Sequence, residues 1–202
     1  MRSLCLLILL ASAPLATAQD QQAVLVTTPP TIDGVVTAQE WGQIPTGEGF
    51  VDEQSGAAGE GGKFWLAYDK EFIYFAAQLE MANPRGIRAD EYRDNVSLGN
   101  DDAVYLAIET FGQLANFNEF GINSRGATAI NIAGGRAAKR EWLGDFTAMG
   151  RKTETGYEVE ARIPWSVMRM PGPGTRDLRF NVIRTNPATG RESIWRYTRT
   201  DP

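Results

Sequence analysis

Residues 64–80 contain two runs of aromatic and aliphatic residues that are separated by the polar pair Asp69-Lys70. Both runs are rich in the residue types that favour strands, and a short polar turn between such runs is typical of a β-hairpin. Further runs of the same kind follow at residues 102–109, 117–123, 128–132, 147–153, 157–163, 178–184 and 193–198. We therefore expect an all-β protein, an antiparallel β-sandwich of two sheets of the jelly-roll or immunoglobulin-like kind.

The remaining segments predict shorter elements and a core. Residues 23–27 resemble a first strand, and residues 37–41 predict one helical turn that buries Trp41. The glycine-rich residues 47–62 have no hydrophobic period, so we expect a mobile surface loop there. The residues expected in the core or at its edges are Trp41, Tyr68, Phe72, Tyr74, Val104, Leu106, Tyr157, Val159, Phe180 and Val182.

The N-terminal residues have the pattern of a secretory signal. Arg2 precedes an apolar stretch at residues 4–15, and Ala16-Thr17-Ala18 supplies the small residues of a cleavage site. The stretch is too short for a membrane-spanning helix, which needs about 20 apolar residues. The sequence therefore predicts a signal peptide at residues 1–18, a domain at residues 19–202, and export to the periplasm or the extracellular space.

The composition excludes several kinds of chemistry. The chain has no histidine, which removes the usual general base and the usual zinc and haem ligand. Its 25 acidic residues against 20 basic ones give a net charge of -5, which argues against nucleic-acid binding. Glu109, Glu119, Glu158 and Glu160 could supply a glycosidase pair, but no pattern indicates the cleft that such a pair needs. We therefore expect a protein that is not an enzyme.

A series of motifs in order along the chain resembles carbohydrate-binding module family 9 and its relatives. The motifs are Ile32-Asp33-Gly34, Glu40-Trp41, Tyr68-Asp69, Phe72-Ile73-Tyr74, Asp101-Asp102-Ala103-Val104-Tyr105-Leu106, Phe120-Gly121-Ile122-Asn123, residues 156–165 and Phe180-Asn181-Val182. The resemblance implies a β-sandwich that recognises a sugar or a glycan end without catalysis. Some relatives are attached to a hydrolase domain. Others resemble the N-terminal domain of outer-membrane β-barrel proteins, so the alternative is a periplasmic accessory domain that acts through protein contacts.

The resemblance also indicates where a sugar would lie. It implies an aromatic contact just before one strand and an acidic contact within it, and these positions hold Gly99 and Tyr105. A basic position on the next strand holds Gly121. None of the three is of the residue type that the resemblance implies for a sugar contact.

The candidate ligand-binding residues combine one exposed aromatic face with planar polar groups. Trp142 lies in a polar context and is the predicted stacking face for a pyranose. The predicted polar partners are Asn100, Arg184 and Arg196. Asp101 and Asp102 open a strand and are the candidate ligands if a cofactor, calcium, is bound. Their alternative role is to hold the turn through hydrogen bonds to loop amides.

Overall fold

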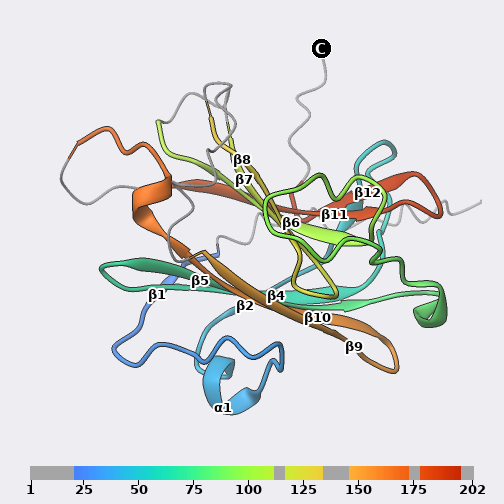
Figure 1. Cartoon of the computed structure of the whole chain (residues 1–202), viewed down its shortest axis with the longest axis horizontal. Coiled ribbons are helices and arrows are strands. Elements are labelled where there is room, and N and C mark those ends of the chain that lie inside the picture. The colour runs from blue at the N-terminus through green and yellow to red at the C-terminus, as the bar shows by residue number, and fades with distance from the viewer. Residues whose placement is uncertain (1–20, 112–116, 134–145, 173–177, 197–202) are drawn as a thin grey trace, which may run out of the picture.

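A computed structural model describes residues 21–111, 117–133, 146–172 and 178–196 of the chain. Two six-stranded sheets lie face to face in it, with a single short α-helix outside one of them (Figure 1). The predicted all-β sandwich is confirmed. Neighbouring strands are antiparallel except for one edge pair, in which the first strand runs parallel to its neighbour.

The first sheet, here called sheet A, has the strand order β1-β4-β5-β10-β9, with β2 paired to β4. Its strands are β1 (Val24–Leu25), β2 (Thr46–Glu48), β4 (Gly62–Tyr68), β5 (Phe72–Glu80), β9 (Thr147–Lys152) and β10 (Gly156–Pro164). Sheet B has the order β3-β12-β11-β6-β7-β8. Its strands are β3 (Val51–Asp52), β6 (Ala103–Glu109), β7 (Asn118–Asn123), β8 (Thr128–Asn131), β11 (Arg179–Asn186) and β12 (Arg191–Ile194).

The hairpin of β4 and β5 turns at Asp69, as its sequence predicts. The Asp69 carboxylate accepts hydrogen bonds from the backbone N–H groups of Glu71 and Phe72, at 2.7 and 2.8 Å, and from the Tyr74 hydroxyl, at 2.7 Å. Partial burial opposes ionisation of Asp69, but these bonds outweigh it and lower the pKa of the carboxyl group. The side chain thus closes the turn through local bonds to the backbone.

The core between the sheets is formed by the side chains that point inward, which are every second residue along each strand. Phe64 and Phe75 of sheet A meet Leu106, Phe120 and Val182 of sheet B, and all five side chains are fully buried. This packing follows from the period of two in a strand, because every second residue points to the same face. Val104, Leu106, Tyr157, Val159 and Val182 are confirmed in this core, with Tyr68 and Phe180 only partly buried. The other expected core residues, Trp41, Phe72 and Tyr74, belong to a second cluster on the outer face of sheet A.

The outer face of sheet A is covered by the segment that carries α1 (Ala38–Trp41). Thr37 caps this helical turn, and Trp41 packs on Trp65, Ala67 and Tyr74 in a second apolar cluster. The predicted helical turn and the buried Trp41 are confirmed, with 1% of this residue exposed.

One carboxylate fastens this cover to the sheet. Glu160 on β10 accepts the Trp41 indole N–H at 2.7 Å and the backbone N–H groups of Asp33 and Gly34 at 3.1 and 2.8 Å. Burial raises the pKa of Glu160, and the bonds from Trp41, Gly34 and Asp33 oppose that rise. Gly34 has a φ of +84°, which a residue with a side chain adopts only with strain.

The prediction of a mobile loop at residues 47–62 is wrong in part. Strand β2 pairs with β4, and β3 pairs with β12 at the edge of sheet B. Phe50 between them is buried in the main core. Strands β2 and β3 have only three and two residues, which is too short to show a hydrophobic period in the sequence. They form because a longer neighbouring strand is available for pairing.

Replacement of Glu160 by alanine is expected to lower the free energy of unfolding by at least about 3 kcal/mol. The change leaves three N–H groups without their acceptor, and each buried unsatisfied group costs about 1–3 kcal/mol. Chemical denaturation of the variant measures this loss. Glu154→Ala, in the exposed turn between β9 and β10, is the control and should change stability by less than about 0.5 kcal/mol. Equal losses in both variants would contradict the role given to Glu160.

Candidate functional site

The outer face of sheet B carries a row of mainly apolar side chains across its strands. The strand register places Tyr105 opposite both Ile183 and Gly121, and continues from Ile183 to Ile194 on β12. An acidic residue lies on each side of this row. Glu192 is paired with Thr185, two residues from Ile183 on β11, and Glu119 is paired with Ala107, two residues from Tyr105 on β6. The sheet therefore presents a ring and a branched aliphatic side chain between two carboxylates.

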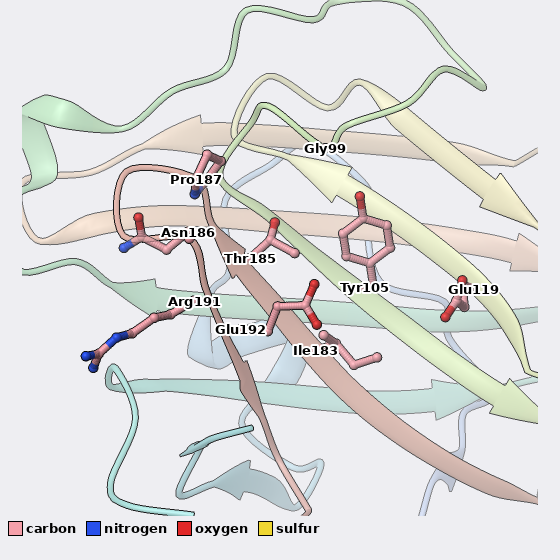
Figure 2. Close-up of a pocket in the computed structure, with 10 residues that line it drawn as sticks. Gly99, Tyr105, Glu119, Ile183, Thr185, Asn186, Pro187, Arg191 and Glu192 are labelled. Carbon is pink, nitrogen blue, oxygen red and sulfur yellow. The ribbon is translucent and has the colours of Figure 1, made fainter. Parts of the chain in front are cut away.

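This face is hollowed around Tyr105, with a cavity volume of about 360 Å³. Figure 2 shows Tyr105 with Glu192 on one side and Glu119 on the other, while Thr185, Asn186 and Pro187 line the side toward the β11–β12 turn. The full lining is Gly99, Tyr105, Glu119, Ile183, Thr185, Asn186, Pro187, Gly190, Arg191 and Glu192. A second hollow of about 320 Å³ shares Tyr105 and Glu119 and extends toward β8.

The Tyr105 ring lies over Gly121. A Cβ atom at position 121 would be only 2.3 Å from the ring carbon Cε1 of Tyr105, so no larger residue fits beneath the ring as it stands. Partial burial, with the nearby carboxylates of Glu119 and Glu192, raises the pKa of Tyr105 to about 12. The phenol is therefore neutral at physiological pH and can both donate and accept a hydrogen bond.

The two flanking carboxylates have different surroundings. Glu119 accepts a hydrogen bond from the Asn131 side chain at 3.0 Å. Partial burial raises the pKa of Glu192, and the neighbouring Glu53 and Glu119 raise it further. The acidic neighbours disfavour the ionised form of Glu192. A ligand that donates hydrogen bonds to this carboxylate, or that carries positive charge, favours the ionised form.

Asp101 and Asp102 hold the loop that borders this face. Asp101 accepts the backbone N–H groups of Asp90 and Glu91 at 2.9 and 3.1 Å and the Asn123 amide at 2.8 Å. Asp102 accepts the backbone N–H of Arg88 at 2.7 Å, and burial raises its pKa. These contacts match the turn-holding alternative that the sequence left open.

No calcium cage is evident in the part of the chain that the structure describes, where no group of three or more acidic side chains is arranged to hold a metal ion. Asp102 Oδ1 is buried and has no hydrogen-bond partner among the described residues, so it is the one oxygen of this pair available to a ligand. Calcium binding at Asp101 and Asp102 stays a prediction.

Arg184 lies between the two sheets rather than on the hollowed face. Its side chain is 1% exposed, donates to the carbonyl oxygens of Gly61 and Glu80, and pairs with Glu60 at 3.2 Å. The strand register explains this position, because Arg184 is opposite the core residue Val104. Its guanidinium therefore joins the sheets at one end of the sandwich.

The other predicted ligand contacts are dispersed. Asn100 is exposed in the loop before β6, beside the lining residue Gly99. Arg196 follows β12, and its guanidinium lies 4.0 Å above the Trp195 ring. Trp195 itself is buried and donates its indole N–H to the Glu48 carbonyl. Trp142 lies outside the described residues.

Sequence reasoning missed most of the lining of the hollow. Ile183, Thr185 and Glu192 come from β11 and β12, which are far along the chain from Tyr105 and Glu119. The available signal was strand alternation, which places Ile183 and Thr185 on the face opposite the core residue Val182. Alternation shows which face a residue is on, but it does not show which strands are neighbours. The pairing of β11 with β6, which brings Ile183 beside Tyr105, therefore could not be predicted.

Comparisons with known proteins agree with this architecture. A family model described as "Carbohydrate family 9 binding domain-like" matches residues 32–199. A search among curated proteins finds no match.

Three solved structures have a similar fold. A carbohydrate binding module family 9 from Caldicellulosiruptor kristjanssonii in complex with cellotriose is 19% identical, with a TM-score of 0.60 over 86% of this chain and 83% of that chain. A structure of such a module from the same organism in complex with glucose has the same identity and TM-score and covers 86% and 84% of the two chains. A putative carbohydrate-binding protein from Bacteroides uniformis ATCC 8492 is 18% identical, with a TM-score of 0.64 over 87% of each chain.

The family model covers all of sheet B and all of sheet A except its two-residue edge strand β1. The resemblance seen in the sequence motifs is thereby confirmed over both sheets. The chain belongs to the carbohydrate family 9 binding domain-like family.

Proposed function

We propose that this chain is a non-catalytic, extracytoplasmic carbohydrate-binding domain that holds a sugar or a glycan end in the hollow around Tyr105. The observation that carries the proposal is the position of that hollow. It lies on the open outer face of sheet B and includes Gly99 and Tyr105, the two positions where the family resemblance implies sugar contacts. Membership of the family and the sugars in the related complexes support it.

The side chains of the hollow suit a pyranose. The half-buried Tyr105 ring and Ile183 offer an apolar surface to the C–H groups of the sugar. Glu119 and Glu192 can accept hydrogen bonds from sugar hydroxyl groups, and the Thr185 hydroxyl, which donates to the carbonyl oxygens of Asp101 and Ala103, can accept one as well. A few polar groups around a mainly apolar surface are the usual composition of a small-molecule site. The face is open, so we expect weak binding of a chain end rather than enclosure of a long glycan.

The positions of the other glutamates support a role without catalysis. Glu158 and Glu160 lie on sheet A, where Glu158 binds Arg151 at 2.8 Å and Glu160 holds the cover of that sheet. Glu119 lies on the outer face of sheet B, and Glu109 is buried. These four glutamates therefore do not share a cleft in which a catalytic pair could act on one bond.

The proposed location outside the cytoplasm rests on the signal-like residues 1–18, which lie outside the described residues. Among the described residues, no helix is long and apolar enough to cross a membrane.

Replacement of Tyr105 by alanine is expected to weaken sugar binding at least about fivefold, since an aromatic contact contributes roughly 1 kcal/mol beyond burial. Isothermal calorimetry with glucose and with cellotriose measures this loss. Met149→Ala, on the edge strand of sheet A, is the control, because its side chain is 44% exposed and lies on the other sheet. Equal affinity of the Tyr105 variant and the native chain would contradict the proposed site. No heat with any sugar would instead favour the accessory role beside an outer-membrane barrel.

Trp142 is tested in the same titrations. Trp142→Ala should weaken binding if this residue adds the stacking face that its polar sequence context predicts. Unchanged binding by Trp142→Ala, together with a loss in Tyr105→Ala, would assign the aromatic contact to Tyr105 alone.

Calcium, if bound at Asp101 and Asp102, should raise the melting temperature through mass action. The rise should be lost in Asp102→Asn, which removes the charge while keeping an oxygen that can accept the Arg88 N–H. Melting curves in a chelator and in millimolar calcium decide this point. Identical melting temperatures of the native chain in both conditions would remove the calcium prediction.

A further inference from the structure

The hollow around Tyr105 has a strong imbalance of charge. Glu119 and Glu192 are both in its lining, and Glu53 lies next to Glu192, to whose carbonyl oxygen it donates its backbone N–H at 3.0 Å. The one basic residue of the lining is Arg191. Its side chain is 72% exposed and lies 3.9 Å from Asp52, and Figure 2 shows its guanidinium directed away from Tyr105.

Among the described residues of the lining, no basic side chain other than the outward-directed Arg191 stands against these acidic groups. The groups that affect ionisation of Glu192 most, besides its own partial burial, are the carboxyls of Glu53 and Glu119, and both disfavour its charged form. A ligand carboxylate placed here would add a further negative charge and would be repelled. A ligand cation would be attracted by Glu119 and Glu192 and could also lie near the Tyr105 ring, whose face favours positive charge.

An ammonium group matches this arrangement by chemistry as well as by charge. It offers three hydrogen-bond donors and no acceptor, whereas the carboxylates of Glu119 and Glu192 offer acceptors alone when they are ionised. A hydroxyl group also donates to a carboxylate, but it is neutral, so only the ammonium adds a Coulomb attraction to its hydrogen bond. The rest of the hollow, the Tyr105 ring and Ile183, still suits the apolar face of a pyranose.

We propose that this hollow prefers an amino sugar, a pyranose that carries a free ammonium group, and that it rejects sugars that carry a carboxylate. This inference rests on the proposed function, because it names the class of sugar that the same site takes. The ammonium lies beside the Tyr105 ring, in the field of Glu192 on one side of the ring and of Glu119 on the other.

Calorimetry of the full chain with four monosaccharides at low salt tests the preference. Glucosamine is expected to bind about tenfold more tightly than glucose, N-acetylglucosamine should bind about as tightly as glucose, and glucuronate should bind more weakly than glucose. Because the hollow is open to solvent, about 0.5 M salt should reduce the advantage of glucosamine to about twofold.

Matched charge variants assign the preference to the hollow. Glu192→Gln and Glu119→Gln keep the size of each side chain and an oxygen that can accept from a hydroxyl group, but they remove the charge that attracts the ammonium. Each should reduce the ratio of glucosamine to glucose affinity at least threefold. Glu71→Gln is the control, since it removes the same charge from an exposed turn of sheet A. Melting temperatures of the variants show whether each is folded before its affinities are compared.

The titration of Glu192 gives the preference a pH dependence with a defined sign. Partial burial, Glu53 and Glu119 raise the pKa of Glu192, so the carboxyl is in part protonated at mildly acid pH and fully charged only above its raised pKa. Between about pH 4 and about pH 7 the amine stays protonated. The affinity for glucosamine should therefore rise across this range, while the affinity for N-acetylglucosamine changes little.

The possible outcomes separate this inference from the proposed function. Equal affinities for glucosamine and glucose, or tighter binding of glucuronate, would overturn the amino-sugar preference and leave sugar binding intact. No binding of any of the four sugars would overturn both. A preference for glucosamine that persists in Glu192→Gln and in Glu119→Gln would place the ammonium elsewhere and would also overturn the inference.

Discussion

The buried carboxylate of Glu160 fastens the segment that covers the outer face of sheet A. Its three hydrogen bonds, to Trp41 and to the backbone of Asp33 and Gly34, fasten a segment of about ten residues across the outer face of sheet A. Buried N–H groups need acceptors, so this cover cannot leave the sheet without a large cost. The outer face of sheet A is thereby covered, whereas the outer face of sheet B, on which Val96 and Leu98 pack beside Tyr105, carries the hollow that we propose for a sugar.

The open face is supported from behind by a second buried charge. Arg184 joins β11 to the carbonyl groups of Gly61 and Glu80 on the opposite sheet and pairs with Glu60. Its neighbour Thr185 points the other way and lines the hollow. A side chain that joins both sheets thus lies directly behind one that lines the hollow, which limits movement of β11 relative to sheet A. Such support is what a shallow binding face needs if its few contacts are to keep their geometry.

Strand alternation allowed most of the fold to be predicted. The errors lie where a strand is too short to alternate or where the structure depends on pairing between distant strands. The hairpin at Asp69 and the buried Trp41 could be identified because each combines a local turn or cap with a regular apolar pattern. Strand β3 could not, since two residues carry no period and pair only because β12 is present. Arg184 was expected at the ligand because its planar guanidinium can bind hydroxyl groups, whereas its side chain points into the space between the sheets, on the same face of β11 as Val182. The hollow itself depends on pairings between distant strands, which local patterns do not contain.

The contact between Tyr105 and Gly121 limits how this face can change during evolution. The ring occupies the space that any side chain at position 121 would need. One substitution in β7, at a residue that need not touch a sugar, would lift the ring into the hollow and reshape it from below. The shape of the ligand surface is therefore encoded partly in a residue without a side chain, and relatives that place a larger residue there must hold a different group at position 105. The two positions are expected to vary together across the family, as a pair that sets the depth of the face.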